Sequence, residues 1–162
     1  IPNGVIKIGG SAFEYCYSLT NINLPNSLIE IYPYAFYGCE RLESVSISYG
    51  TEFIARGAFR NCRNLTSVII PNSVYYIKET AFESCGKLTI YGCSNSEAER
   101  YAELYEINFI PLSNSDILIL KHLLINDLPL TNTLEIAEID IDKNGEIDVF
   151  DLVLMKKQRL NK

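Results

Sequence analysis

The chain has 162 residues, of which 48% are hydrophobic and 21% charged, and its formal net charge is −6. This composition is that of a globular protein with a sizeable core, which excludes a disordered chain. The acidic balance gives no support to nucleic-acid binding, and no apolar run approaches the ~20 residues that span a bilayer. Because the chain begins at Ile1 without Met or a signal-like segment, we expect a mature fragment.

From Ile8 to Leu88 the sequence repeats with a period of 23 residues and no insertion. A unit of about 20–29 residues with Leu and Ile at fixed offsets predicts a leucine-rich solenoid, an α/β fold built on a parallel sheet. Each unit adds a short strand and, opposite it, a turn or short helix, and neighbouring units share one core. Equivalent residues should therefore form ladders: Ile8, Ile31, Ile54 and Ile77; Phe13, Phe36, Phe59 and Phe82; Cys16, Cys39, Cys62 and Cys85; Leu19, Leu42, Leu65 and Leu88.

Strand-like alternation appears once in each unit, at Ile22-x-Leu24, Val45-x-Ile47 and Val68-x-Ile70. Turn signals follow at Pro25-Asn26-Ser27 and Pro71-Asn72-Ser73, whereas Ser48-Tyr49-Gly50 departs from this pattern. Solenoids bind ligands on extended surfaces, so the exposed strand residues are candidates for contact with an unknown ligand. These candidates are Asn21, Asn23, Ser44, Ser46, Ser67 and Ile69.

The five cysteines allow two interpretations. The chain has no CxxC pair, and four cysteines share one position in the unit, which favours unpaired core residues that behave as small hydrophobes. The alternative is the metal or disulfide chemistry of an exported protein, with Cys85 and Cys93 as the candidate pair.

The recurring pattern Ile-Pro-Asn-Ser/Gly-Val…Ile-x-x-x-Ala-Phe-x-x-Cys-x-x-Leu resembles the BspA-like class of bacterial surface leucine-rich repeats. The resemblance covers about residues 1–110 and implies a first domain over residues 1–111. It includes the closing segment from Ile90 to Phe109, which is similar to the end of that family's repeats. In this segment Ser96 is expected to cap a helix over Glu97–Leu104, which covers the last apolar coil.

Residues 140–151 place oxygen-bearing side chains at the spacing of an EF-hand calcium loop. Gly145 at loop position 6 supplies the sharp turn, and Glu146 at position 7 contributes its main-chain carbonyl. Without a cation the carboxylates of this loop would repel one another, so we expect one Ca²⁺; the alternative is an acidic, solvated turn. The candidate ligands are Asp140, Asp142, Asn144, Glu146, Asp148 and Asp151.

Residues 112–162 contain two similar helical patterns, which begin at Asp116 and Asp151, with a short helix predicted between them at 131–138. This tandem resembles the type I dockerin module of cellulosomes, a small all-α, EF-hand-like domain. The resemblance implies a calcium-dependent partner, the cohesin module of a scaffoldin. The first half departs from the family, because its ligand positions hold Tyr105, Ile107, Phe109 and Ile110.

In dockerins the cohesin is contacted by loop positions 10 and 11 and by the helix that follows. The resemblance places Val149, Phe150, Leu154, Lys156 and Lys157 at these positions. An aromatic anchor with a charged rim is suited to an interface, although Val149 could instead lie in the module's own core. The first half has Asn114 and Ser115 at the equivalent positions, so a single binding orientation is expected.

Together these patterns predict a non-catalytic adaptor outside the cell or on the bacterial cell surface. The sole histidine, His122, lies on an apolar helical pattern without an obvious nucleophile, so we expect no enzyme within these residues. One alternative is the C-terminal part of a larger cellulosomal enzyme whose catalytic domain lies upstream. Another is a calcium-stabilised structural domain without a cohesin partner.

Overall fold

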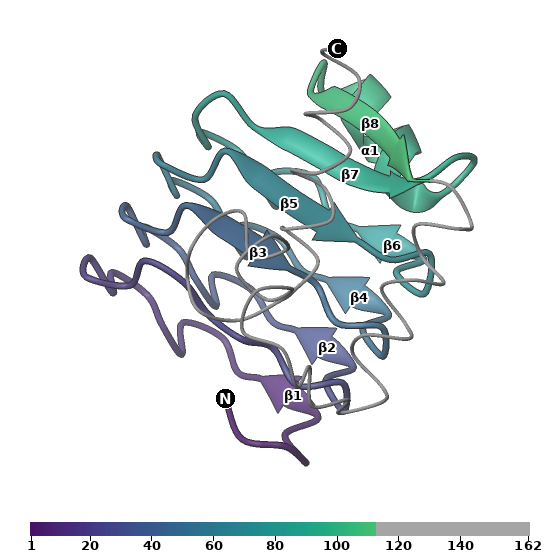
Figure 1. Cartoon of the computed structure of the whole chain (residues 1–162). Coiled ribbons are helices and arrows are strands. Elements are labelled where there is room, and N and C mark those ends of the chain that lie inside the picture. The colour runs from purple at the N-terminus through teal and green to yellow at the C-terminus, as the bar shows by residue number, and fades with distance from the viewer. Residues whose placement is uncertain (113–162) are drawn as a thin grey trace, which may run out of the picture. The chain divides into compact units, whose positions relative to one another are not determined.

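Each 23-residue repeat forms one coil of the chain, and the short strands of successive coils form two sheets (Figure 1). The computed structural model describes residues 1–112, and the chain divides after Pro111 into two units. Sheet A contains β1 (Lys7–Ile8), β2 (Glu30–Ile31), β4 (Phe53–Ile54) and β6 (Tyr76–Ile77). Sheet B contains β3 (Ser44–Ser46), β5 (Ser67–Ile70), β7 (Thr89–Cys93) and β8 (Asn108–Leu112).

Strands of neighbouring coils pair in parallel, with a register that follows the repeat. Ile31 of β2 lies between Ile8 and Ile54, and Val45 of β3 pairs with Val68 of β5. The predicted parallel-sheet solenoid is therefore confirmed. Two details differ from expectation: residues 20–25 of the first coil form no regular strand, and residues 33–42 form consecutive turns where a short helix was one option.

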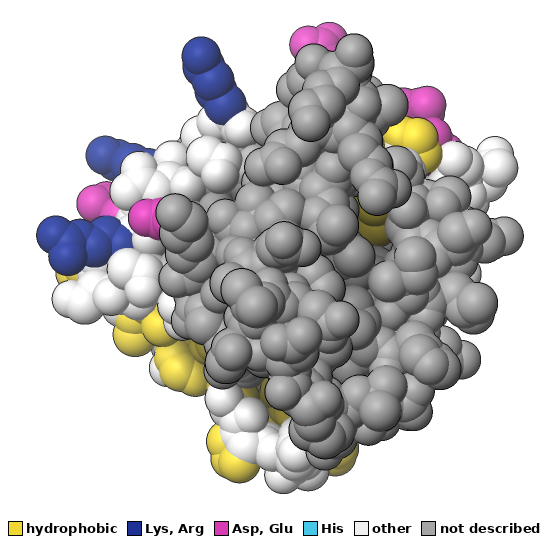
Figure 2. Space-filling view, viewed as in Figure 1, with side chains coloured by type: hydrophobic (Ala, Val, Ile, Leu, Met, Phe, Trp, Pro, Cys, Tyr) yellow, Lys and Arg dark blue, Asp and Glu magenta, His cyan; other side chains and the backbone are white. Residues whose placement is uncertain are grey.

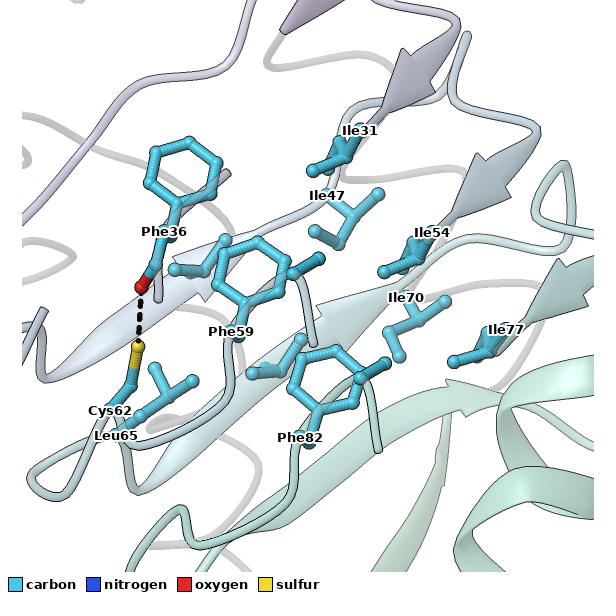
Figure 3. Packing of buried hydrophobic residues seen from close by; sticks show 14 of the residues in the cluster. Ile31, Phe36, Ile47, Ile54, Phe59, Cys62, Leu65, Ile70, Ile77 and Phe82 are labelled. Atoms are coloured by element: carbon cyan, nitrogen blue, oxygen red, sulfur yellow. Dashed lines mark hydrogen bonds between the residues drawn. The ribbon is translucent and has the colours of Figure 1, made fainter. Parts of the chain in front are cut away.

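The core lies between the two sheets and the turn segments, and equivalent side chains stack along it (Figure 3). The rings of Phe13, Phe36, Phe59 and Phe82 lie parallel, with successive centroids 5.1, 5.0 and 5.3 Å apart. The isoleucine ladder of sheet A runs beside them and is buried from Ile8 to Ile77. A coil cannot bury these side chains alone, so each coil depends on its neighbours.

The cysteines form a ladder of thiols that are hydrogen-bonded to the backbone. Cys39, Cys62 and Cys85 each donate to the carbonyl of a phenylalanine in the preceding coil, at 3.1, 3.1 and 3.2 Å. All five cysteines are free, so the unpaired-core interpretation is confirmed and the Cys85–Cys93 disulfide is wrong. Burial raises the pKa of the Cys85 thiol to about 12, which keeps it protonated and unreactive at neutral pH.

The irregular turn at Ser48-Tyr49-Gly50 preserves a hydrogen bond that the other coils make differently. The hydroxyls of Ser27 and Ser73 donate at 2.8 Å to the carbonyls of residues 5 and 51 in the preceding coil. Gly50 stands at the equivalent position and has no hydroxyl. Thr51, one residue later, donates to the Leu28 carbonyl at 3.2 Å in its place. The sequence departs from the repeat, but the contact between coils remains.

Two positions in every turn segment adopt left-handed backbone conformations. The first is occupied by Ser11, Tyr34, Gly57 and Thr80, with φ between 58° and 67°. The second is occupied by Tyr15, Gly38, Asn61 and Ser84, with φ between 57° and 69°. Thr80 is the least suited to this conformation because its side chain is β-branched, and its buried hydroxyl has no hydrogen-bond partner within the described part of the chain.

Helix α1 (Glu97–Leu104) closes the last coil. Ser96 caps it by accepting from the Glu99 N–H, as predicted. Two side chains of α1 accept N–H groups that the last coil leaves open: Glu97 Oε1 accepts from Ile77 at 3.1 Å, and the Tyr101 hydroxyl accepts from Phe82 at 3.3 Å. The helix thus covers the apolar core and also satisfies backbone donors that a further coil would have met.

The substitution Thr80→Gly should stabilise the protein by about 1 kcal/mol, because it removes a strained side chain and a buried hydroxyl that has no partner among residues 1–112. The matched change Gly57→Ala at the same position of the preceding coil should destabilise it. A Cβ there would lie 2.6 Å from the Tyr34 ring. Urea unfolding of the two variants measures both effects, and a loss of stability in Thr80→Gly would contradict the strain argument.

Glu97 should make stability depend on pH in the acid range. The Arg100 guanidinium, 2.6 Å away, lowers the pKa of Glu97, and the Ile77 N–H adds to this effect. Because the folded pKa lies below the unfolded value of about 4.3, this stabilisation is present above that value and is lost as the pH falls through the folded pKa. Glu97→Gln keeps an acceptor for Ile77 but cannot ionise.

The difference in unfolding free energy between wild type and Glu97→Gln should therefore shrink from neutral pH to about pH 3. Urea unfolding at several pH values measures it. A difference that stays constant over this range would show that the charge of Glu97 contributes nothing.

Candidate interaction surfaces

The residues that the sequence suggested for ligand contact lie on β3 and β5 of sheet B and, for Asn21 and Asn23, on the irregular segment of the first coil. Asn21 and Asn23 are exposed, and Ser44, Ser46 and Ser67 are half-buried. Ile69 was expected to be exposed but is 5% exposed, so this prediction is wrong. It lies in β5, an inner strand of sheet B, in register with Ser46 of β3 on one side and Tyr91 of β7 on the other. The candidates therefore share a face but differ in accessibility.

A cluster of four tyrosines lies on the turn segments of the first two coils, and we call it the tyrosine cluster: Tyr15, Tyr17, Tyr34 and Tyr37. Tyr15 is central, with its ring centroid 5.7 Å from Tyr17 and 5.2 Å from Tyr37, the latter edge to face. Tyr34 continues the cluster, 5.8 Å from Tyr37. Tyr15 and Tyr17 are 50% and 54% exposed, so the cluster presents aromatic surface to solvent.

Glycines in the following coils make room for two of these rings. A Cβ on Gly38 would lie 2.7 Å from the Tyr15 ring, and one on Gly57 would lie 2.6 Å from the Tyr34 ring. The Tyr37 hydroxyl accepts from Asn61 Nδ2 at 2.9 Å. Interaction with Tyr37 raises the pKa of Tyr15, so that ring is neutral at physiological pH. The cluster is therefore an aromatic surface that neighbouring coils hold in place.

The outer face of sheet A carries charged side chains at one end and aromatic side chains at the other. At its N-terminal end Lys7 and Glu30 form an ion pair at 3.1 Å. At the other end the rings of Phe53 and Tyr76 stack with centroids 5.7 Å apart, and Tyr75 beside them is 67% exposed. Exposed aromatic rings of this kind occur at protein interfaces, because they bury a large area with few rotatable bonds.

Charged side chains gather at the edge of the solenoid away from sheet A, where Figure 2 shows Lys and Arg beside acidic residues. Ion pairs join neighbouring coils, Arg60 with Glu83 at 3.1 Å and Arg63 with Glu40 at 3.8 Å. Because positive and negative side chains alternate along this edge, it has no uniform positive potential that would attract a polyanion.

Residues 1–112 contain no group of three or more side chains suited to hold a metal ion. The predicted calcium ligands and the predicted cohesin contacts lie outside the described residues and stay predictions. Tyr105, Ile107, Phe109 and Ile110, predicted to replace the first calcium loop, lie in the turn after α1 and in β8. No helix in the described part is long and apolar enough to cross a membrane.

Sequence reasoning missed the tyrosine cluster. Its members come from two units, Tyr15 and Tyr17 from the first and Tyr34 and Tyr37 from the second, and neither pair by itself indicates that the four rings meet. A signal was present, since Tyr15 stands at the position where the next unit has Gly38, and likewise Tyr34 precedes Gly57. A large ring one period before a glycine in a stacked repeat predicts that the ring covers the glycine.

Comparison with known proteins agrees with this architecture. Residues 1–106 match the family described as the BspA type leucine rich repeat region, in six copies. A leucine rich cell surface protein from Faecalibacterium prausnitzii is 30% identical with a TM-score of 0.55, and the match covers 63% of this chain and 33% of that protein. A leucine-rich repeat protein from Bacteroides ovatus is 28% identical with a TM-score of 0.51, over 68% and 30% of the two chains.

This chain thus spans about one third of the length of these relatives. No curated protein matches it. The family match covers more than half of the sequence, and it coincides with the coils and the cap in the structure. The chain therefore belongs to the BspA-type leucine-rich repeat family.

Proposed function

We propose that this protein is a non-catalytic adaptor that works outside the cell or on the bacterial cell surface. Its repeat domain binds a protein ligand, and residues 112–162 attach it to a cohesin module of a scaffoldin through a calcium-dependent dockerin. The observation that carries this proposal is the twelve-residue loop Asp140–Asp151, with oxygen ligands and glycine at calcium-loop spacing. The Val149-Phe150 pair inside the loop supplies the contact surface.

The repeat domain supports a binding role through its exposed aromatic surface. Tyr15 and Tyr17 of the tyrosine cluster are half exposed, and Tyr75 is more exposed still. Tyrosine is enriched where proteins bind one another, because its ring is rigid and apolar and its hydroxyl bonds to polar groups. The similar protein from Faecalibacterium prausnitzii is described as a cell surface protein, which supports the same location here.

The chemistry of the repeat domain supports a non-catalytic role. Residues 1–112 contain no histidine, and their cysteines are unpaired thiols of the core and cap. Cys85 is held protonated by burial, so it is a poor nucleophile at neutral pH. A base and an activated nucleophile within hydrogen-bonding reach, which acyl transfer requires, are absent from this part of the chain.

The double substitution Val149→Ala and Phe150→Ala should abolish cohesin binding, because it removes the apolar anchor that the dockerin resemblance assigns. Calorimetric titration against a panel of cohesin modules, with Ca²⁺ present, measures the loss. The matched control is Asn114→Ala with Ser115→Ala, at the equivalent positions of the first half. We expect the control to bind as wild type does, and equal weakening by both pairs would contradict a single binding orientation.

Calcium should stabilise the C-terminal unit, because ligand carboxylates that repel one another in the empty loop are neutralised by the ion. A chelator should lower the melting temperature of wild type, with one ion bound per chain by titration. Asp140→Asn with Asp142→Asn should melt at one temperature with or without Ca²⁺. A wild-type melting temperature unaffected by the chelator would rule out this coupling.

A further inference from the structure

The turn segments of neighbouring coils are joined by a repeated pair of backbone hydrogen bonds. In the first coil the N–H groups of Phe13 and Tyr15 donate to carbonyls of the second, at 2.7 and 2.8 Å. The second coil bonds in the same way to the third, and the third to the fourth, each time from residue i to residue i+22. These two N–H donors recur in each coil and bond to the next one, and Ser11 and Tyr34 add a third in the first two coils.

The fourth coil has no complete successor. Its equivalent donors are Phe82 and Ser84, and the Tyr101 hydroxyl accepts from Phe82. The residues 22 positions after Phe82 and Ser84 belong to α1 and the turn that follows it, not to another coil. The Ser84 N–H has no hydrogen-bond partner among residues 1–112. One donor of the ladder thus remains open beside the cap.

A cavity of about 470 Å³ lies at this place, between the last turn segment and the end of α1. Its apolar wall comes from Leu88, Tyr105 and Ile107, and Ser84 is part of its lining. The buried Thr80 hydroxyl, which lacks a partner in the described part, lies in the same lining. The volume is within the range of sites that bind small ligands or short peptide segments.

The interior coils indicate what fills such a space. Next to the third coil, the space that corresponds to this cavity is filled by the turn segment of the fourth coil. The Glu83 carbonyl of that segment accepts the Asn61 N–H at 2.9 Å. The Cys85 thiol of that segment donates to the Phe59 carbonyl, and Leu88 continues the leucine ladder. The complementary ligand therefore has a backbone carbonyl and, a few residues later, an apolar side chain.

We infer that this cavity is a binding site for a short peptide segment of a protein partner. A peptide carbonyl accepts the Ser84 N–H, and a leucine-sized side chain packs against Leu88 and Tyr105. The inference deepens the proposed role of the repeat domain in protein binding and rests on it. It is independent of the calcium loop and of the cohesin.

The probe is a synthetic peptide with the sequence of residues 58–65, which makes these contacts over the second coil. Added to the chain of 162 residues, it should shift the NMR signal of the Ser84 amide saturably and slow its hydrogen exchange. The same peptide with Leu65→Asp should bind at least about tenfold more weakly, because its side chain cannot enter an apolar wall.

The matched protein variants are Tyr105→Ala, which removes part of the wall, and Ile6→Ala, which removes an exposed side chain at the other end of the stack. Tyr105→Ala should weaken the peptide about tenfold, and Ile6→Ala should leave it unchanged. Equal affinity in wild type and Tyr105→Ala, or shifts confined to the tyrosine cluster, would overturn the site. Cohesin titration of the same samples tests the adaptor role separately, since the cavity residues and the calcium loop are different.

Discussion

The stacking of one coil on the next at a fixed period is the constraint on which the rest of this structure depends. Backbone N–H groups of one turn segment donate to the following coil, and phenylalanine rings 5.0–5.3 Å apart stack along the same direction. The hydrogen bonds and the ring spacing both follow from the distance between hydrogen-bonded strands of neighbouring coils, which is about 4.8 Å. An inserted residue would break the hydrogen bonds and displace the ring at once, which accounts for a repeat without insertions.

This constraint makes the last coil different from those inside the stack. Interior coils satisfy each other's hydrogen bonds, whereas the fourth coil presents donors and an apolar edge with no further coil among residues 1–112 to cover them. Helix α1 covers most of this edge. Glu97 and Tyr101 accept the N–H groups of Ile77 and Phe82, and Ala98 and Ala102 are buried against the core. A helix does not reproduce the shape of a turn segment, however, so the cavity beside Ser84 remains.

Positions that point away from the ladder are free to carry other residues, and the tyrosine cluster occupies such positions. The cluster depends on the stack, because Tyr15 and Tyr34 lie over glycines of the next coil. The repeat thus provides a rigid frame, and the outer residues of each unit give it a particular surface. This separation explains how a domain with a uniform core can present an individual binding face.

The sequence by itself determined the elements that depend on local spacing. The period predicted the parallel coils and the Phe13–Phe82 ladder, and the pattern around Ser96 predicted the helix and its cap. The shared position of four cysteines predicted that they are unpaired. The tertiary structure decided which outer side chains meet and which are covered: the tyrosine cluster, the burial of Ile69, and the acceptance of the Ile77 N–H by Glu97. The contacts that decide these features, such as those of Tyr15 with Tyr37 and of Ile77 with Glu97, join residues about 20 positions apart and depend on how each coil lies over its neighbour.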